Sequence, residues 1–191
     1  HKRNPEFIDD AIETISNSVD RMNRLLKKLR TDGQEHQARL SVSDVVKKSV
    51  SDCWQKKPKL VTDIEESCRP ITAEEVRLVM TFTHFIKNAL EATPEDGEVR
   101  VTLRCEGDTA KVQITDTGSG MDREFIHNRL FKPFETTKSG KGMGIGVYLS
   151  REYVNELGGT LNVHSAIGEG TCVTVILPLE PQTAEQPQTT V

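Results

Sequence analysis

Apolar residues recur at every third or fourth position near the start of the chain. The recurring residues are Ile8, Ile12, Ile15, Val19, Met22, Leu26 and Leu29. This a/d spacing predicts one helix over about residues 4–30, whose narrow apolar stripe faces another helix. We expect the partner helices to lie outside this chain or to come from a second copy. A helix packed on its own domain is the alternative.

Helical and alternating patterns mix in the rest of the chain. Helices are predicted over Ser43–Lys56, from a capping box at Thr72 and Glu75 to Ala92, around Arg123–Arg129, and over Gly144–Leu157. Strands are predicted at Ala38–Val42, Leu60–Ile64, Glu98–Cys105, Ala110–Thr115, Thr160–Ser165 and Thr171–Leu177. Because no βαβ rhythm is visible, we predict an α+β fold, a two-layer sandwich with helices over one face of an antiparallel sheet. The polar stretch from Glu180 to Val191 is predicted to be a disordered tail.

Composition narrows the class of protein. Of the 191 residues, 28% are charged and 35% hydrophobic, as in ordinary soluble domains. The net charge of −4 gives no reason to expect a nucleic-acid partner. We interpret the basic start of the chain as a solvated helix flank, in preference to a lipid or nucleic-acid surface. The chain begins His1-Lys2-Arg3 without Met, and we interpret it as part of a longer protein.

The four cysteines show no C-x-x-C spacing. This argues against a structural zinc site, and a chain of this size needs no disulfide framework. Reduced thiols in a cytosolic setting are therefore predicted.

Two short glycine-bearing segments carry candidate chemistry. Asp116-Thr117-Gly118-Ser119-Gly120 ends a predicted strand, where a carboxylate can accept a hydrogen bond from an adenine amino group. The two glycines allow positive φ and let the main chain approach the ring, although a simple Asp-Gly turn has the same letters. The glycines of residues 140–146 open a helix after a lysine-bearing loop, an arrangement that favours phosphate and differs from a P-loop. A flexible surface loop is the alternative there.

Asn88 and His84 share one face of the predicted helix that ends at Ala92. An Asn amide oxygen is a hard, neutral ligand that suits Mg²⁺ already bound to phosphates. His84 is a candidate phosphate contact or general base. A lone histidine is, however, more often a core residue.

Taken in order, these segments resemble a known family. Asn88, Asp116–Gly120, Phe131-Lys132-Pro133-Phe134 and Gly140–Ile145 resemble the N, G1, F and G2 boxes of sensor histidine kinases. Gly168-Glu169-Gly170-Thr171 resembles the last signature of that family, whose Thr reaches the adenine side. The match covers about residues 37–179 and implies the Bergerat ATP-binding fold, an α/β sandwich shared with gyrase.

The resemblance implies a set of site residues, with ATP and Mg²⁺ as cofactors. Asn88 would hold Mg²⁺, and the residues implied in catalysis are His84, Asn88 and Lys138. The residues implied in nucleotide binding are Lys87, Asn88, Asp116, Gly118, Gly120, Met121, Phe131, Phe134, Lys138, Gly140, Gly142, Met143, Gly144, Ile145 and Thr171. The glycine-rich lid is expected to be mobile over 132–143 without nucleotide.

The same resemblance implies domains and partners. Residues 1–32 resemble the second helix of a dimerisation and phosphotransfer hairpin, followed by the catalytic domain at 37–179 and the tail at 180–191. The expected partners are a homodimer partner, the phospho-acceptor helix missing from this chain, and a response regulator. No histidine of the chain has an H-box context, so we expect ATP binding without autophosphorylation.

His84 departs from the usual pattern, in which Asn stands at this position. The segment from His84 to Thr93 resembles a subgroup of kinases linked to PEP-CTERM and exopolysaccharide systems, often membrane-anchored in full length with this domain in the cytoplasm. Three alternatives stay open: a serine kinase of the anti-sigma type, a conformational ATPase, and a non-catalytic nucleotide-sensing scaffold. The heptad helix argues against the first two, and His84 keeps the third open.

Overall fold

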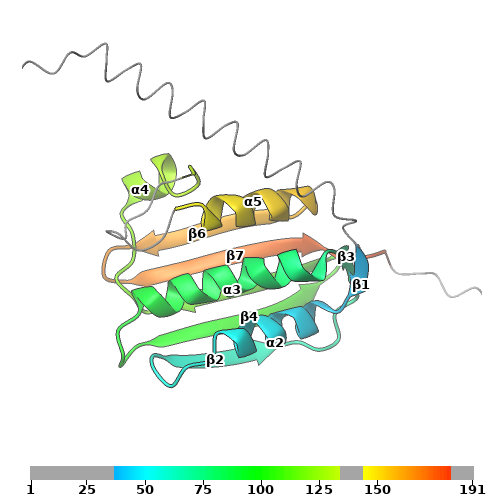
Figure 1. Cartoon of the computed structure of the whole chain (residues 1–191), viewed down its shortest axis with the longest axis horizontal. Helices are drawn as coiled ribbons and strands as arrows, with labels where there is room; N and C mark the ends of the chain where they lie inside the picture. Colours follow the sequence, from blue (N-terminus) through cyan, green and yellow to red (C-terminus); the bar gives the residue numbers. More distant parts are fainter. Residues whose placement is uncertain (1–36, 134–143, 182–191) are drawn as a thin grey trace, which may run out of the picture. The chain divides into compact units, whose positions relative to one another are not determined.

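The computed structural model describes residues 37–133 and 144–181, and the helix predicted over about residues 4–30 lies outside them. The described helices are α2 (Val42–Asp52), α3 (Glu75–Ala92), α4 (Arg123–Asn128) and α5 (Gly146–Glu156) (Figure 1). The described strands are β1 (Ala38–Leu40), β2 (Lys59–Ile64), β3 (Ile71–Ala73), β4 (Glu98–Glu106), β5 (Thr109–Asp116), β6 (Thr160–Ala166) and β7 (Gly170–Pro178).

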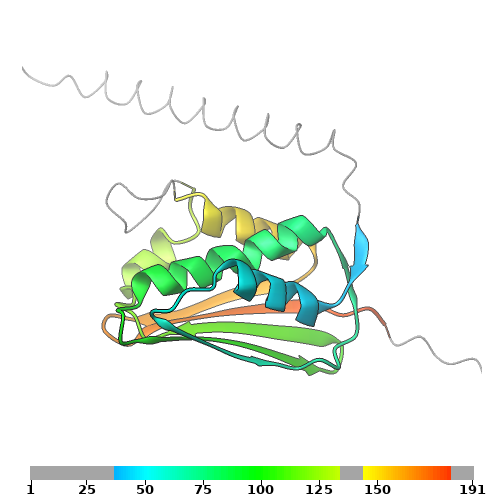
Figure 2. The same ribbon diagram turned by 60° about the horizontal axis from the view of Figure 1, so that its bottom comes forward.

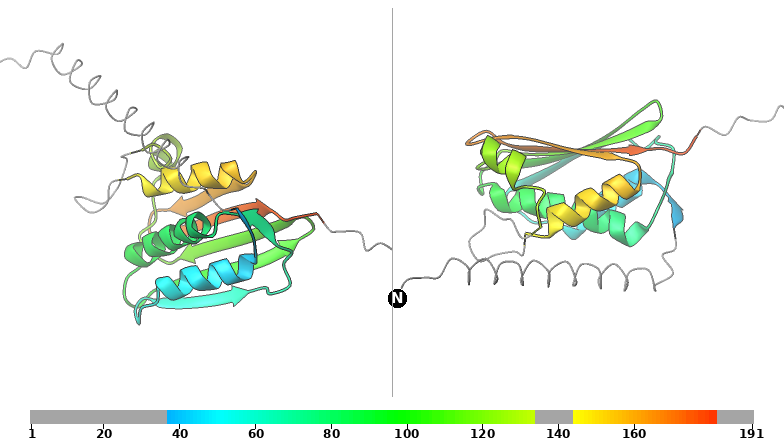
Figure 3. Two further views of the ribbon diagram at one scale, coloured as in Figure 1. Left: turned by 45° about the vertical axis from the view of Figure 1, so that its right-hand side comes forward. Right: turned by 90° about the horizontal axis from the view of Figure 1, so that it is seen from above.

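Five strands form one sheet in the order β2-β4-β5-β7-β6, and β1 pairs with β3 separately. The helices α2, α3 and α5 lie over one face of the sheet, as two further directions of view also show (Figures 2 and 3). The predicted two-layer α/β sandwich is therefore confirmed. The sheet is not wholly antiparallel, because β2 runs parallel to β4 and α3 lies between them in the chain. The prediction of no βαβ unit is wrong at this one place.

Alternation along the strands supplies one half of the core. In β4, Val99, Val101 and Leu103 are fully buried, while Arg100 and Arg104, which alternate with them, are exposed. The other half comes from α3, which buries Leu78, Phe82 and Ile86 completely. Each such side chain stabilises the fold by about 1.5–3 kcal/mol on burial. This packing holds α3 across the middle of the sheet, with α2 and α5 on either side of it.

The start of α3 differs from the predicted capping box. Thr72 lies in β3, and the N-cap is Glu74, whose side chain makes no capping bond. The Tyr153 hydroxyl of α5 instead accepts a hydrogen bond from the Glu74 N–H (2.9 Å) and donates one to its carbonyl oxygen (3.1 Å). The capping box fails because β3 pairs with β1 through Thr72, which makes this segment extended.

The prediction of four reduced thiols is also wrong. Cys68 and Cys105 form a disulfide, while Cys53 and Cys172 are free. The parallel pairing of β2 with β4 carries the segment after β2 to the end of β4, where the Glu65 carboxylate also accepts a hydrogen bond from the Cys105 N–H (3.0 Å). Pairing between residues 37 positions apart depends on this sheet order, which spacing alone does not reveal.

The chain stays anchored just past β7. The Glu180 carbonyl accepts a hydrogen bond from Arg69 (2.8 Å), and its carboxylate accepts one from Thr72 (2.7 Å) and one from Arg39 (2.8 Å). Glu180 thus belongs with the folded part, whereas the rest of the predicted tail, at 182–191, lies outside the described residues. Among the helices of the described ranges, none has the length and apolar character needed to cross a membrane.

Candidate functional site

Asp116 ends β5 in the middle of the sheet. The strand register places it opposite Val99 of β4 and Thr171 of β7, and its residue surface is only 5% exposed. Its Oδ1 accepts hydrogen bonds from the Gly118 N–H (2.8 Å) and the Thr171 N–H (3.2 Å). Burial raises the pKa of the Asp116 carboxyl, and the two backbone hydrogen bonds act in the opposite direction.

The two carboxylate oxygens of Asp116 differ in their hydrogen bonds. Oδ1 is fixed by the main chain, whereas Oδ2 accepts no hydrogen bond from any residue of the described ranges. A carboxylate whose second oxygen lacks a partner is suited to a ligand that donates a hydrogen bond. The exocyclic amino group of adenine is such a donor, so the site fits the base of ATP.

Ser165 supports this end of the sheet and was not predicted from the sequence. Its register on β6 places it beside Thr171. The Ser165 hydroxyl donates to the Gly170 carbonyl (2.8 Å) and accepts from the Met121 N–H (2.9 Å). Because its one proton is used on Gly170, the hydroxyl of Thr171, 2.9 Å away, is the donor of the pair. The network ties Met121 and Thr171, both predicted site residues, to one side chain.

The glycines around Asp116 are needed for close packing of the main chain. A Cβ on Gly118 would overlap the Ala92 carbonyl at the end of α3, and one on Gly120 would overlap the Ala166 carbonyl of β6. Gly120 has a positive φ of 67°, as predicted, whereas Gly118 does not have positive φ. The loop after β5 is therefore held against both α3 and the β6–β7 hairpin.

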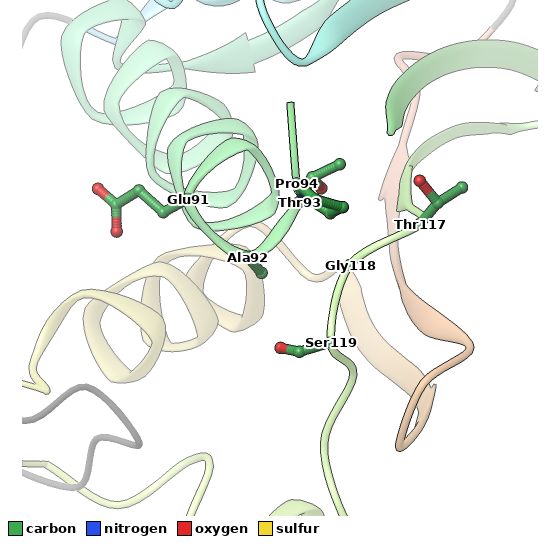
Figure 4. Close-up of a pocket in the computed structure, with 7 residues that line it drawn as sticks. All are labelled: Glu91, Ala92, Thr93, Pro94, Thr117, Gly118 and Ser119. Atoms are coloured by element: carbon green, nitrogen blue, oxygen red, sulfur yellow. The ribbon is translucent and has the colours of Figure 1, made fainter. Parts of the chain in front are cut away.

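A pocket of about 460 Å³ lies where the end of α3 meets this loop. Figure 4 shows its lining residues, which are Glu91, Ala92, Thr93, Pro94, Thr117, Gly118 and Ser119. The Ser119 N–H donates a hydrogen bond to the Ala92 carbonyl (3.2 Å), which closes the junction of the two segments. Asp116 does not line the pocket, but its Oδ1 accepts a hydrogen bond from the N–H of the lining residue Gly118. The pocket and the Asp116 carboxylate are therefore adjacent.

The second predicted cluster lies where α3 meets α5. Asn88 Nδ2 is 2.9 Å from His84 Nε2, one helical turn earlier, and both side chains are partly buried. The His84 ring abuts Gly146, the first residue of α5. The structure therefore brings together Asn88, His84 and the described end of the glycine-rich segment, where Gly144 has a φ of +64°.

Other predicted residues are placed less centrally. Lys87 is exposed on α3; burial raises the pKa of the Cys53 thiol at the end of α2, and the positive charge of Lys87 acts in the opposite direction. Phe131 lies under the guanidinium of Arg151, with 4.4 Å between Cζ and the ring centroid. Arg151 had no signal in the sequence, because its contact with Phe131 depends on how α5 crosses that loop.

Part of the predicted lid lies outside the described residues. It contains Phe134, Lys138, Gly140, Gly142 and Met143, together with most of the segment expected to be mobile. Ile145 is described and is the N-cap of α5, where its side chain makes no capping bond. The helix begins at Gly146, two residues later than predicted.

The described side chains near Asn88 offer few ligands to a Mg²⁺ ion. The described residues contain no group of three or more His, Cys, Asp or Glu side chains that could hold a metal ion. Mg²⁺ in nucleotide enzymes often takes only one or two protein ligands and completes its shell with phosphates and water. A single amide oxygen, that of Asn88, fits this mode of binding.

Comparison with known proteins gives a family for the chain. The sequence profile described as "Histidine kinase-, DNA gyrase B-, and HSP90-like ATPase" matches residues 73–181. The chain belongs to this family. Sporulation kinase E of Bacillus subtilis (strain 168) is 34% identical over 125 residues, which is 65% of this chain and 16% of that protein. The sensor histidine kinase ZraS of Klebsiella oxytoca is 30% identical over 152 residues, which is 79% of this chain and 31% of that protein.

Solved structures of the family share the fold. The catalytic domain of histidine kinase ThkA superposes with a TM-score of 0.66 at 20% identity, covering 75% of this chain and 95% of that one. Full-length ShkA in complex with AMPPNP gives a TM-score of 0.65 at 21% identity, covering 91% of this chain and 38% of that one. The predicted resemblance to the ATP-binding catalytic domain of sensor histidine kinases is thus confirmed.

Proposed function

We propose that this domain transfers the γ-phosphoryl group of ATP to a histidine of a sensor kinase, from which the phosphoryl group passes to a response regulator. The observation that carries the proposal is the Asp116 carboxylate, fixed on one oxygen by the main chain and left with a second oxygen for a donor. Its support is the family membership of the chain and the names of its relatives, which include a sporulation kinase and a sensor histidine kinase. The chain spans less than a third of the length of these relatives.

The proposed binding mode divides ATP between two clusters. Asp116 Oδ2 accepts a hydrogen bond from the adenine amino group, while Met121 and Thr171 flank the base, held by Ser165. Asn88 would hold Mg²⁺ through its amide oxygen. The metal, when bound, neutralises charge on the phosphates. The lid residues, with Lys138, Gly140 and Gly142 among them, supply a positive charge and main-chain N–H groups for the phosphates.

The proposed reaction needs positioning more than covalent chemistry by the protein. The bond between the γ-phosphorus and its bridging oxygen breaks, ADP leaves, and a phosphorus–nitrogen bond forms to the acceptor imidazole, which loses its proton. Phosphoryl transfer of this kind relies on alignment and charge neutralisation. The acceptor histidine lies on a helix of the full-length protein, which pairs with a second copy.

Two experiments test this proposal. Calorimetric titration of the chain with ATP should show binding that becomes tighter when Mg²⁺ is added. Labelled ATP should place acid-labile, base-stable phosphate on the full-length protein. Acid-stable phosphate would favour a serine kinase, release of phosphate without a phosphoprotein would favour an ATPase, and binding without either would favour a nucleotide-sensing scaffold.

The cellular setting is part of the same proposal. Consumption of ATP and transfer to a response regulator both require the domain to face the cytoplasm. We propose a membrane-anchored parent of the PEP-CTERM or exopolysaccharide-linked type, with the segment from His84 to Thr93 as support. Fractionation of cells that express the full-length protein tests the anchor.

A further inference from the structure

The imidazole of His84 occupies the space between the amide of Asn88 and the start of α5. His84 and Asn88 are one turn apart on α3, so their side chains lie on one face of the helix. Their contact joins Asn88 Nδ2 to His84 Nε2 at 2.9 Å. An amide NH₂ can only donate, so Nε2 is the acceptor and the ring proton of a neutral His84 is on Nδ1.

This hydrogen bond orients the Asn88 amide. When Nδ2 is held by His84, the carbonyl oxygen on the other branch of the planar amide points away from the imidazole. In the tautomer with the ring proton on Nδ1, rotating the amide by half a turn would set two acceptors, Oδ1 and Nε2, against each other. His84 thus selects the end of the amide that faces away from it, and that end is the oxygen a hard cation requires.

The ring of His84 also accounts for the glycine at position 146. A Cβ on Gly146 would lie 2.6 Å from His84 Nδ1 and would overlap Cε1 and Nε2. Gly146 does not have the positive φ that would demand glycine for its backbone. The missing side chain therefore makes room for the imidazole, and the two residues are complementary in size.

We propose that His84 is a positioning residue that presents the Asn88 oxygen to the metal and that Gly146 is its size partner on α5. This inference rests on the proposed function, in which Asn88 holds Mg²⁺. It assigns the His84 ring to orienting a ligand, since Nε2 is already used as an acceptor. It also links the metal ligand to the residue at which the glycine-rich segment becomes helix α5.

The test compares four variants by calorimetric titration with ATP, with and without Mg²⁺. His84→Leu keeps bulk but removes the acceptor, whereas His84→Asn keeps an acceptor in a smaller side chain. Gly146→Ala and the double variant His84→Asn/Gly146→Ala probe the size relation. His164→Leu, at an exposed position on β6, is the matched control. Thermal unfolding of each variant monitors the fold.

The quantity to compare is the gain in ATP affinity on adding Mg²⁺. We expect His84→Leu to reduce this gain roughly tenfold or more, as is usual for the loss of a group that orients a metal ligand. Affinity for ATP without Mg²⁺ should be nearly unchanged. His84→Asn should retain most of the gain, and His164→Leu all of it. Gly146→Ala should lower both the gain and the melting temperature, and His84→Asn should restore both.

Two results would overturn the inference. One is an unchanged Mg²⁺ gain in His84→Leu. The other is a Gly146→Ala defect that is as large in the His84→Asn background as in the natural chain. Failure of the proposed function itself looks different: the natural chain would show no Mg²⁺ gain, or Asn88→Ala would keep it.

Discussion

The two ends of β5 carry the same residue types and use them differently. At the start, Asp108 is 87% exposed and pairs with the Arg69 guanidinium at 2.7 Å, next to Gly107, whose surroundings are open. At the end, Asp116 is buried and held by main-chain N–H groups, and Gly120 packs against the main chain of β6. An aspartate and a positive-φ glycine therefore mean a surface turn at one end and a candidate binding site at the other.

The contrast shows that position in the sheet, more than residue type, separates the two roles. An exposed ion pair contributes about 0–1 kcal/mol, because solvent competes for both partners. A buried carboxylate costs stability unless its oxygens are hydrogen-bonded, and such groups are concentrated at functional sites. We therefore attribute the presence of a buried carboxylate at position 116 mainly to ligand binding, and not to stability of the fold.

The largest expected effect is on the unfolding free energy, which alanine substitution should lower by different amounts at Gly107 and Gly120. Gly107→Ala should cost about 1–2 kcal/mol of unfolding free energy, since only the left-handed backbone is unfavourable for alanine there. Gly120→Ala should cost at least about 3 kcal/mol, because its Cβ would also overlap the Ala166 carbonyl. Urea denaturation measures both. Equal losses would show that the loop after β5 is no more tightly packed than the β4–β5 turn.

The next effect concerns nucleotide affinity. Asp116→Asn should weaken ATP binding at least tenfold, or about 1.4 kcal/mol. With the amide oxygen held by the Gly118 and Thr171 N–H groups, the new NH₂ would face the adenine amino group, donor against donor. Asp108→Asn is the matched change at the other end and should leave affinity unchanged. Calorimetric titration of both variants with ATP measures the two affinities. An equal loss of ATP affinity in both variants would show that Asp116 has no special role in binding.

A smaller effect is a difference in pH dependence. Burial raises the pKa of folded Asp116, so its favourable contribution is complete below the unfolded pKa of about 3.9 and is lost as pH rises through the folded pKa. The hydrogen bond from Arg104 lowers the pKa of exposed Asp63, whose contribution is present above about 3.9 and lost as pH falls through its folded pKa.

Unfolding free energies measured at pH values below and above the unfolded pKa of about 3.9 show whether each carboxyl group adds or removes stability as pH rises. Relative to the natural chain, Asp116→Asn should gain stability as pH rises, whereas Asp63→Asn should lose it. The same sign for both substitutions would mean that Asp116 is not a buried carboxyl of the kind described.

The smallest expected effect is the stability cost of Asp108→Asn. Loss of its exposed pair with Arg69 should lower the unfolding free energy by less than about 1 kcal/mol, and added salt should shrink the difference. Denaturation at low and high ionic strength measures it. A larger cost that persists in salt would place Asp108 in a structural role like that of the buried end.

The sequence predicts most of the frame of this site because its signals are local. The helix that ends at Ala92 and the strand that ends beside Asp116 follow from periodicity, and the order of motifs leads to the fold. Ser165 and Arg151 carry no such signal, since their contacts with Met121 and Phe131 are set by strand register and helix crossing.

The three-residue strand β3 is invisible for a similar reason: its pairing with β1 overrides the local capping pattern. The link between Cys68 and Cys105 likewise depends on β2 running parallel to β4. Signals that arise only from long-range contacts are thus the ones that residue patterns along this chain do not contain.

The most direct test of the central claim is a calorimetric comparison of ATP with an analogue that lacks the 6-amino group of the base. The natural chain should bind ATP at least about tenfold more tightly than the analogue, and Asp116→Asn should lose that preference. Equal affinities for the two nucleotides in the natural chain, or a preference that survives in Asp116→Asn, would contradict recognition of the adenine amino group by this carboxylate.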